Sequence, residues 1–270
     1  MSQQSKSHGR KSISANSQPR ALMTPSPQLA GVWTAQILTL FPEAFPGVLG
    51  ESLTGRALED GKWALNTIDL RLFGEGKHRN VDDTPAGGGA GMVLKPNVAG
   101  AALDRALAQQ KTPLPMICLS PRGMPFTQAR ARAWANADGV TMLCGRFEGI
   151  DQRVIDHYQL EEISLGDFVL TGGEIAAQAM IDATVRLLPD ILGNEASIAE
   201  ESHMAGLLEH PHYTRPALWN GRSIPDVLQS GHHINIAKWR QEMSHQVTKE
   251  KRPDLWADFQ NALGEKDPKG

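Results

Sequence analysis

Three segments decide the fold: MICLSPRG (residues 116–123), VTMLCGRFEG (140–149) and EISLGDFVLTGGE (162–174). Each contains a short apolar run that continues into a loop with glycine, and sequence compatible with a helix follows each loop. Strand and helix therefore alternate along the chain, which predicts an α/β fold with a mostly parallel sheet. Because such sheets bind ligands beyond the carboxyl ends of their strands, the three loops are the first candidates for a ligand site.

The flanking sequence extends this pattern. Further strands are expected over residues 33–40 and 67–73, and helices over residues 51–60, 97–110, 127–137, 150–158 and 174–188. Three more helices are expected over residues 225–230, 234–249 and 253–263. The helix over residues 174–188 is apolar on nearly every side, which predicts burial all round, against a partner subunit as well as its own sheet.

The chain divides into four parts on composition. Residues 1–31 are rich in Ser and Gln and carry no acid, which favours a disordered tail, although transit peptides share this composition. Residues 32–192 form the α/β domain, residues 193–206 a small and polar mobile linker, and residues 207–270 a helical domain. No apolar run is long enough to span a bilayer, so we expect a cytoplasmic protein without a membrane partner.

Charge, cysteine content and known motifs narrow the function. A net charge of −3 predicts that any contact with nucleic acid is a local patch. Cys118 and Cys144 read as buried small side chains, and the paired His232 and His233 lack further ligands, so no metal site is expected. No GxGxxG follows a strand, which disfavours a nicotinamide dehydrogenase, and the sequence contains no P-loop, HExxH or GxSxG motif.

Seven segments resemble one known family in order and spacing over about residues 32–259. The chain resembles the bacterial tRNA (guanine-N1)-methyltransferases, which belong to the knotted SPOUT-type class. The matching segments are LFPEAF (40–45), HRNVDDTPAGGGAGM (78–92), LSPRG (119–123), LCGRFEGIDQRVI (143–155), SLGDFVLTGGE (164–174), LPDILGNEAS (188–197) and HPHYTRP (210–216).

The resemblance implies a deep trefoil knot through the three loops, an obligate homodimer with shared active sites, and bent S-adenosylmethionine as methyl donor. Mg²⁺ as a second cofactor is left open. The implied methyl acceptor is N1 of the guanine immediately 3′ of the tRNA anticodon, when another guanine precedes it. The residues implied to bind the cofactor are Leu119, Ser120, Pro121, Gly145, Phe147, Gly149, Leu165, Gly166, Asp167, Phe168, Val169, Leu170, Gly172 and Gly173.

The reaction needs a base and an anion stabiliser. Guanine N1 carries a proton at neutral pH, so a carboxylate must accept that proton as N1 attacks the methyl. The resemblance implies Glu201 for this role, where the family has aspartate. It also implies Arg186 as the residue that contacts the guanine, whereas the spacing from Asp182 alone favours an intrahelical ion pair. Negative charge that develops on O6 calls for such a donor.

Both domains are expected to contact RNA, and no DNA partner is expected. The resemblance implies contacts to guanine or tRNA from Gly91, His78, Asp82, Arg146 and Glu148, and a basic helical face predicts contacts from Lys238 and Arg240. Two family positions differ, because Cys118 replaces a frequent aromatic residue and Phe147 a common tyrosine. The competing interpretations are a non-catalytic tRNA-binding protein and a knotted RNA methyltransferase with another target.

Overall fold

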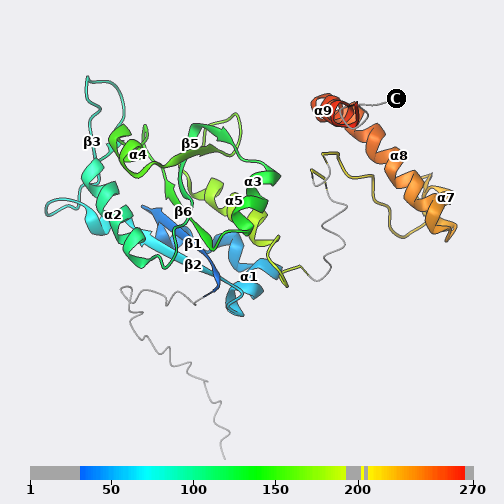
Figure 1. Cartoon of the computed structure of the whole chain (residues 1–270), viewed down its shortest axis with the longest axis horizontal. Coiled ribbons are helices and arrows are strands. Elements are labelled where there is room, and N and C mark those ends of the chain that lie inside the picture. Colours follow the sequence, from blue (N-terminus) through cyan, green and yellow to red (C-terminus); the bar gives the residue numbers. More distant parts are fainter. Residues whose placement is uncertain (1–30, 193–201, 204–205, 265–270) are drawn as a thin grey trace, which may run out of the picture.

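A five-stranded sheet forms the centre of the computed structural model, which describes residues 31–192, 202–203 and 206–264. The strand order is β2-β1-β6-β5-β7, and every neighbouring pair is parallel (Figure 1). The predicted α/β fold with a parallel sheet is therefore confirmed, and the trefoil knot stays a prediction. The strands are β1 (Trp33–Thr39), β2 (Trp63–Asp69), β5 (Met116–Pro125), β6 (Gly139–Cys144) and β7 (Glu161–Ser164).

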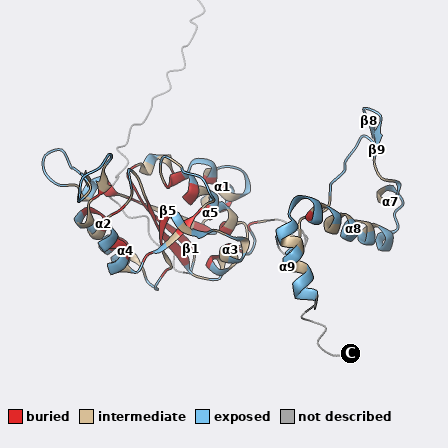
Figure 2. Cartoon of the chain, turned by 90° about the horizontal axis from the view of Figure 1, so that it is seen from above, coloured by how far each residue is buried: buried red, intermediate tan, exposed pale blue. Residues whose placement is uncertain are grey.

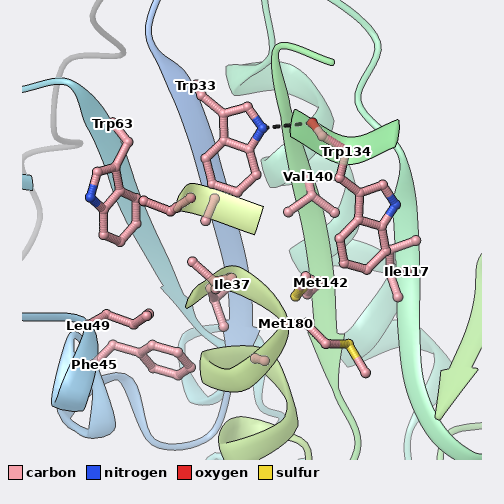
Figure 3. Close-up of a cluster of buried hydrophobic side chains, with 14 of the residues drawn as sticks. Trp33, Ile37, Phe45, Leu49, Trp63, Ile117, Trp134, Val140, Met142 and Met180 are labelled. Atoms are coloured by element: carbon pink, nitrogen blue, oxygen red, sulfur yellow. Dashed lines mark hydrogen bonds between the residues drawn. The ribbon is translucent and has the colours of Figure 1, made fainter. Parts of the chain in front are cut away.

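Helices cover both faces of this sheet, because alternate strand residues point to opposite faces. On one face, Ile37 and Met142 pack in a core with Met180 of α5, and Trp33 Nε1 donates to Trp134 O of α3 at 2.9 Å (Figure 3). On the other face, Leu38 belongs to a second core, to which α2 and α4 contribute. The helices are α1 (Ser52–Glu59), α2 (Pro96–Gln109), α3 (Gln128–Ala135), α4 (Gln152–Tyr158) and α5 (Glu174–Val185).

Strand β5 departs from the expected short run. The sequence suggests that the strand ends at Leu119, but it continues to Pro125. Leu119 and Met124 both pair with Ile163 of β7, so the intervening residues bulge out of the sheet. At Gly123, where the chain comes back to β7 after the bulge, a Cβ atom would lie 2.3 Å from the backbone nitrogen of Ile163, so this position needs glycine. The bulge carries the first of the three predicted ligand loops.

Strand β2 lies earlier than the expected strand over residues 67–73. It begins at Trp63, which is buried, and ends at Asp69. The Asp69 side chain accepts a hydrogen bond from the backbone nitrogen of Arg71 at 2.8 Å and caps the 3₁₀ helix η3 (Leu70–Phe73). Local capping therefore ends the strand even though the apolar alternation continues, which made the predicted boundaries wrong.

Helix α5 leaves one side exposed in the single chain, and its expected burial against a partner subunit stays a prediction. It ends at Val185 rather than Leu188, and its buried residues face the sheet. Ile175 is 62% exposed, and Ala179 and Asp182 are exposed on the same side. One stripe of this apolar helix is therefore left uncovered by the chain's own fold.

Short elements connect these layers. They are η1 (Pro42–Ala44), η2 (Gly47–Gly50), β3 (Asp82–Asp83) and β4 (Val93–Leu94), and β3 pairs with β4 in an antiparallel ladder.

The C-terminal part contains the three expected helices, α7 (Asp226–Gln229), α8 (His233–Lys251) and α9 (Pro253–Gly264). It also contains a small hairpin that the sequence analysis missed, β8 (Leu218–Trp219) with β9 (Arg222–Ser223). Most residues here are exposed, in contrast to the buried sheet (Figure 2). The predicted domain boundaries stay predictions, and the tail and most of the linker lie outside the described residues. Among the described helices, none is long and apolar enough to cross a bilayer.

Candidate active site

A pocket of about 380 Å³ opens at the carboxyl ends of β5, β6 and β7. This position is the one that the parallel sheet predicts for a ligand, and the volume falls in the range of about 300–1,000 Å³ typical of small-molecule sites. The walls come from the β5 bulge, the loop after β6 and the loop between β7 and α5. The three glycine-containing loops predicted from the sequence therefore meet at one site.

Twelve of the predicted cofactor residues line this pocket. They are Leu119, Ser120, Pro121, Gly145, Phe147, Gly149, Leu165, Phe168, Val169, Leu170, Gly172 and Gly173. The other two, Gly166 and Asp167, belong to the same loop but do not line the pocket. The structure thus gathers the predicted set, and its role in binding a cofactor stays a prediction.

Phe147 occupies an uncommon backbone conformation at the pocket wall. Its φ angle is 61°, in the left-handed region that aromatic residues rarely adopt. Its side chain lines the pocket and is 47% exposed. Backbone conformations of this kind persist where the surrounding structure holds them, and they cluster at ligand sites.

The glycine-rich segment at residues 87–91 lies beside the pocket, where it contacts Glu148 of the pocket wall. A Cβ atom on Gly91 would lie 2.3 Å from the Glu148 side chain, so Gly91 leaves room for this carboxylate. The backbone nitrogen of Glu148 donates to Met92 O at 2.9 Å, and that of Leu94 donates to Gly149 O at 3.0 Å. Two predicted guanine-contacting residues, Gly91 and Glu148, are therefore neighbours beside the pocket.

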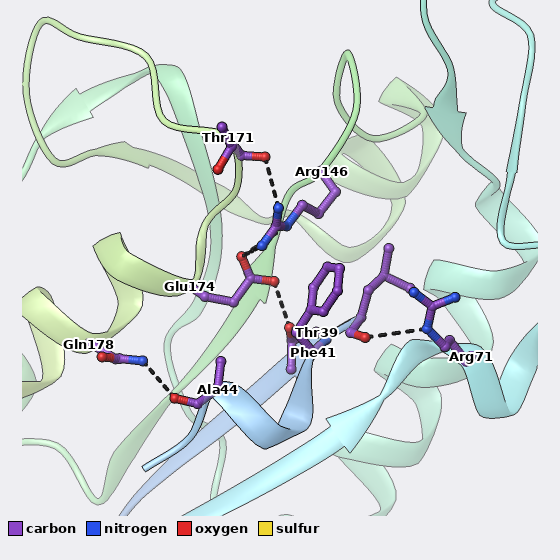
Figure 4. A network of polar contacts seen from close by, with 9 residues as sticks. Thr39, Phe41, Ala44, Arg71, Arg146, Thr171, Glu174 and Gln178 are labelled. Carbon is purple, nitrogen blue, oxygen red and sulfur yellow. Dashed lines mark hydrogen bonds and ion pairs between the residues drawn. The ribbon is translucent and has the colours of Figure 1, made fainter. Parts of the chain in front are cut away.

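An ion pair between Arg146 and Glu174 ties the pocket loops together. Arg146 Nη2 lies 2.9 Å from Glu174 Oε2, and Arg146 Nη1 donates to Thr171 O at 3.2 Å (Figure 4). Glu174 is only 4% exposed, and its Oε1 accepts a hydrogen bond from Thr39 Oγ1 at 2.7 Å. The Arg146 guanidinium carbon lies 4.4 Å from the ring centre of Phe41. We call these five residues the Arg146 cluster.

Gly172 makes room for this cluster. A Cβ atom at Gly172 would lie 2.1 Å from Arg146 Nε, so any larger residue would displace the guanidinium. Beside it, a Cβ atom at Gly173 would lie 2.9 Å from Cys144 Cα. The two glycines thus let the loop before α5 pack directly on the loop after β6.

Comparison with known proteins agrees with this architecture. Residues 34–258 match the family model of the tRNA (guanine-1)-methyltransferase TrmD. The chain belongs to this family. A tRNA (guanine-N(1)-)-methyltransferase from Ruegeria pomeroyi is 66% identical over 234 residues, 87% of this chain and 96% of the relative. Similar proteins of the same description come from Cereibacter sphaeroides, 64% identical over 89% of this chain and 97% of the relative, and from Brucella suis, 55% over 87% and 95%.

Of the two predicted catalytic residues, only Arg186 belongs to the described residues, and it does not line the pocket. Glu201 lies outside the described residues. Arg186 is half-buried at the C-terminal end of α5, where its backbone nitrogen donates to Asp182 O at 3.2 Å. The Asp182 carboxylate accepts a hydrogen bond from Thr54 Oγ1 at 3.1 Å. The roles of Glu201 and Arg186 in this family member stay predictions.

The predicted RNA contacts are spread over several elements. Arg146 and Glu148 line the pocket, whereas His78 and Asp82 do not. His78 is exposed in a turn before β3, and Asp82 lies on β3. On α8 both Lys238 and Arg240 are exposed. Of these predicted RNA contacts, Arg146 and Glu148 therefore lie together at the pocket, and the others lie elsewhere on the protein.

Sequence reasoning missed several pocket residues. Arg122 lines the pocket from the β5 bulge, and its Nη2 lies 2.9 Å from Glu162 Oε1 on β7. Val93 and Gln152 line it from β4 and α4, outside the three glycine-containing loops. Glu174, which pairs with Arg146 beside the pocket, was also not predicted. The sequence does single it out, because it is the one acid in the first two turns of a mostly apolar helix.

Both cysteines have the packing role predicted from the sequence. Cys118 is 2% exposed and Cys144 is fully buried. Burial raises the pKa of the Cys118 thiol to about 12 and that of Cys144 well above its usual value. The reactive thiolate is therefore negligible near neutral pH. We expect no alkylation by iodoacetamide of the folded protein at pH 8 and two labels per chain after denaturation, read by intact mass. Labelling of the folded chain within minutes would contradict this assignment.

Proposed function

We propose that this protein transfers the methyl group of S-adenosylmethionine to N1 of the guanine immediately 3′ of the anticodon in tRNA, when guanine also precedes it. The observation that carries the proposal is the pocket at the carboxyl ends of β5, β6 and β7, in a chain that belongs to the tRNA (guanine-1)-methyltransferase family. The family supports the reaction, and the pocket offers a place for it. The specificity for the neighbouring guanine follows from the family resemblance alone.

The residues of the pocket fit S-adenosylmethionine. Glycines at 145, 172 and 173 bring backbone groups to its surface, where an adenine and a ribose can be bound through main-chain donors and acceptors. Phe147 and Leu170 supply apolar contact. When bound, this cofactor supplies an electrophilic methyl group on a sulfonium ion.

The chain's own residues would handle the proton and the charge. Glu201 would accept the proton of guanine N1 as N1 attacks the methyl group that the cofactor would supply. Arg186 donates to O6, where negative charge develops. The chain needs no acid for the leaving group, because a sulfonium ion that gave up its methyl would become a neutral thioether.

A homodimer would cover the exposed stripe of α5. Ile175 is 62% exposed, and Val48 of η2 and Leu53 of α1 are 68% and 50% exposed. Both η2 and α1 pack beside α5, because a Cβ atom at Gly47 of η2 would lie 2.8 Å from Gln178 Oε1 and Thr54 Oγ1 of α1 donates to the Asp182 carboxylate at 3.1 Å. Exposed apolar surface shared by neighbouring elements is typical of subunit interfaces.

We expect Ile175→Glu to convert the dimer to a monomer, because a carboxylate would be buried without a partner in the interface. Sedimentation velocity measures the change. Leu107→Glu is the control, because Leu107 is 39% exposed on α2, which packs on the other face of the sheet. A variant that sediments like the wild-type chain would contradict the assignment of this face to the dimer.

Transcripts that differ at one nucleotide test the proposed specificity. One tRNA carries guanine before the target guanine and the other carries adenine there. We expect incorporation of labelled methyl into the first transcript only. Equal incorporation into both would overturn the specificity, and incorporation into neither would overturn the proposed function.

A further inference from the structure

The C-terminal part exposes a continuous segment that no proposed role uses. Every residue from 211 to 223 is exposed, including three with large apolar side chains. Tyr213 is 49% exposed, Leu218 65% and Trp219 64%. An exposed tryptophan between two exposed neighbours does not stabilise a hydrophobic core, so we looked for a binding partner that this side chain could contact.

The β8–β9 hairpin fixes how Trp219 is presented. Trp219 pairs directly with Arg222, so both side chains project from the same face of the ladder. Asn220 and Gly221 form the two-residue turn with φ angles of 47° and 75°, the positive values that a tight hairpin requires. Ile224 N donates to Ala217 O at 3.0 Å and continues the ladder. The hairpin tip thus places an aromatic ring beside a guanidinium group.

The hairpin base is anchored to the helices. Gln229 Nε2 of α7 donates to Ile224 O at 3.1 Å. At the other end of the segment, the rings of Tyr213 and His210 contact Trp239 of α8, with centroid distances of 6.1 and 6.3 Å. Trp239 lies between Lys238 and Arg240, the two residues predicted to contact phosphates. The ring contacts therefore hold the segment against α8, the helix that carries both of these residues.

The charge of this segment favours a polyanion. Residues 210–225 contain no Asp or Glu, although acids stand at both adjacent positions, Glu209 and Asp226. Within the described part of the chain, no carboxylate pairs with Arg215 or Arg222. Unpaired guanidinium groups beside exposed aromatic rings are the combination with which proteins bind RNA, through phosphate contacts and stacking on unpaired bases.

We propose that the β8–β9 hairpin is a tRNA-contacting tip, in which Trp219 packs on a base or ribose and Arg222 contacts a phosphate. This inference rests on the proposed function, which supplies tRNA as the substrate. It adds the contact chemistry to that substrate and extends the RNA surface beyond α8.

Binding of the full chain to the tRNA transcript with two guanines, measured by fluorescence anisotropy at several salt concentrations, tests the proposal. We expect Trp219→Ala to weaken binding about tenfold and Trp219→Phe to restore most of it, because a stacked ring is worth this much. Arg222→Gln should lower the slope of log affinity against log salt by about one. The affinity for S-adenosylmethionine, measured by calorimetry, should not change in any variant.

Two matched controls accompany these variants. Leu263→Ala removes a similarly exposed apolar side chain from α9, since Leu263 is 55% exposed. Arg153→Gln removes one positive charge from the exposed pair with Asp151 on α4. Neither control should change tRNA affinity. Wild-type affinity and salt slope in the Trp219 and Arg222 variants would overturn the proposal.

A further outcome separates tRNA from a second copy of this chain. If the hairpin variants sediment as monomers while the wild-type chain is a dimer, the hairpin is a subunit contact and the proposal is wrong. Methylation by the wild-type chain is measured separately. Its absence together with weakened tRNA binding by the variants would remove the proposed function and leave the hairpin contact standing.

Discussion

Glu201→Gln is expected to lower the rate of methyl transfer by about a thousandfold, within the range of 10²–10⁴ that a general base contributes. The glutamine side chain keeps the size of glutamate but cannot accept the N1 proton. Affinity for S-adenosylmethionine and for tRNA should stay at wild-type values, because the change removes a proton acceptor rather than a wall of the pocket. Single-turnover kinetics with saturating cofactor measure the chemical step.

The neighbouring acid provides the control for this variant. Glu200→Gln changes the same charge one residue earlier and should retain wild-type turnover. Unchanged turnover in Glu201→Gln would show that another group accepts the proton. Loss of cofactor binding in the same variant would instead make Glu201 a structural residue.

Glu174→Ala is expected to destabilise the fold by about 3–5 kcal/mol, the usual effect of removing one partner from a buried ion pair. Glu174 is 4% exposed and holds both Arg146 and Thr39, so the substitution leaves a guanidinium group in the pocket wall without its carboxylate. Because Arg146 also binds Thr171 O, the loops on both sides of the pocket should loosen. We therefore expect weaker S-adenosylmethionine binding together with a lower denaturant midpoint.

An exposed ion pair gives the matched comparison. Arg153 lies 2.7 Å from Asp151, and its side chain is 78% exposed. Arg153→Ala should lower stability far less than Glu174→Ala, because solvent screens such pairs. Equal losses in Glu174→Ala and Arg153→Ala, measured by urea unfolding, would contradict the structural role of the Arg146 cluster.

The pocket was predictable because its signal is local. Each of the three segments places an apolar run directly before glycine and a small set of polar residues, and parallel strands bring such loops to one edge. Twelve of the fourteen proposed cofactor residues line the pocket for this reason. The family resemblance supplied the identity of the ligand, which the spacing of residues did not.

Other features depended on contacts that no local pattern encodes. The β5 bulge exists because Leu119 and Met124 share one partner, Ile163, on another strand. The exposed stripe of α5, which includes Ile175, was not predicted, because the helix is apolar on nearly every side and its sequence does not show which side the chain leaves uncovered. Tertiary pairing decides each of these.

The hairpin was missed although its signal is local. Asn220-Gly221 is the dipeptide most typical of a two-residue hairpin turn, and the flanking Leu218-Trp219 and Arg222-Ser223 pair across it. Its strands are two residues long, too short for an alternating apolar pattern to appear. Turn chemistry, rather than hydrophobic period, carries the information here.

Mass spectrometry of the modified tRNA identifies both the methylated atom and the methylated nucleotide, and so tests the proposed reaction directly. The full chain is incubated with S-adenosylmethionine and the transcript that carries two guanines, and the RNA is digested to fragments and to nucleosides. We expect N1-methylguanosine in the fragment that contains the nucleotide 3′ of the anticodon, and in no other fragment. A methyl group on another base, another guanine atom or another position of the tRNA would contradict it.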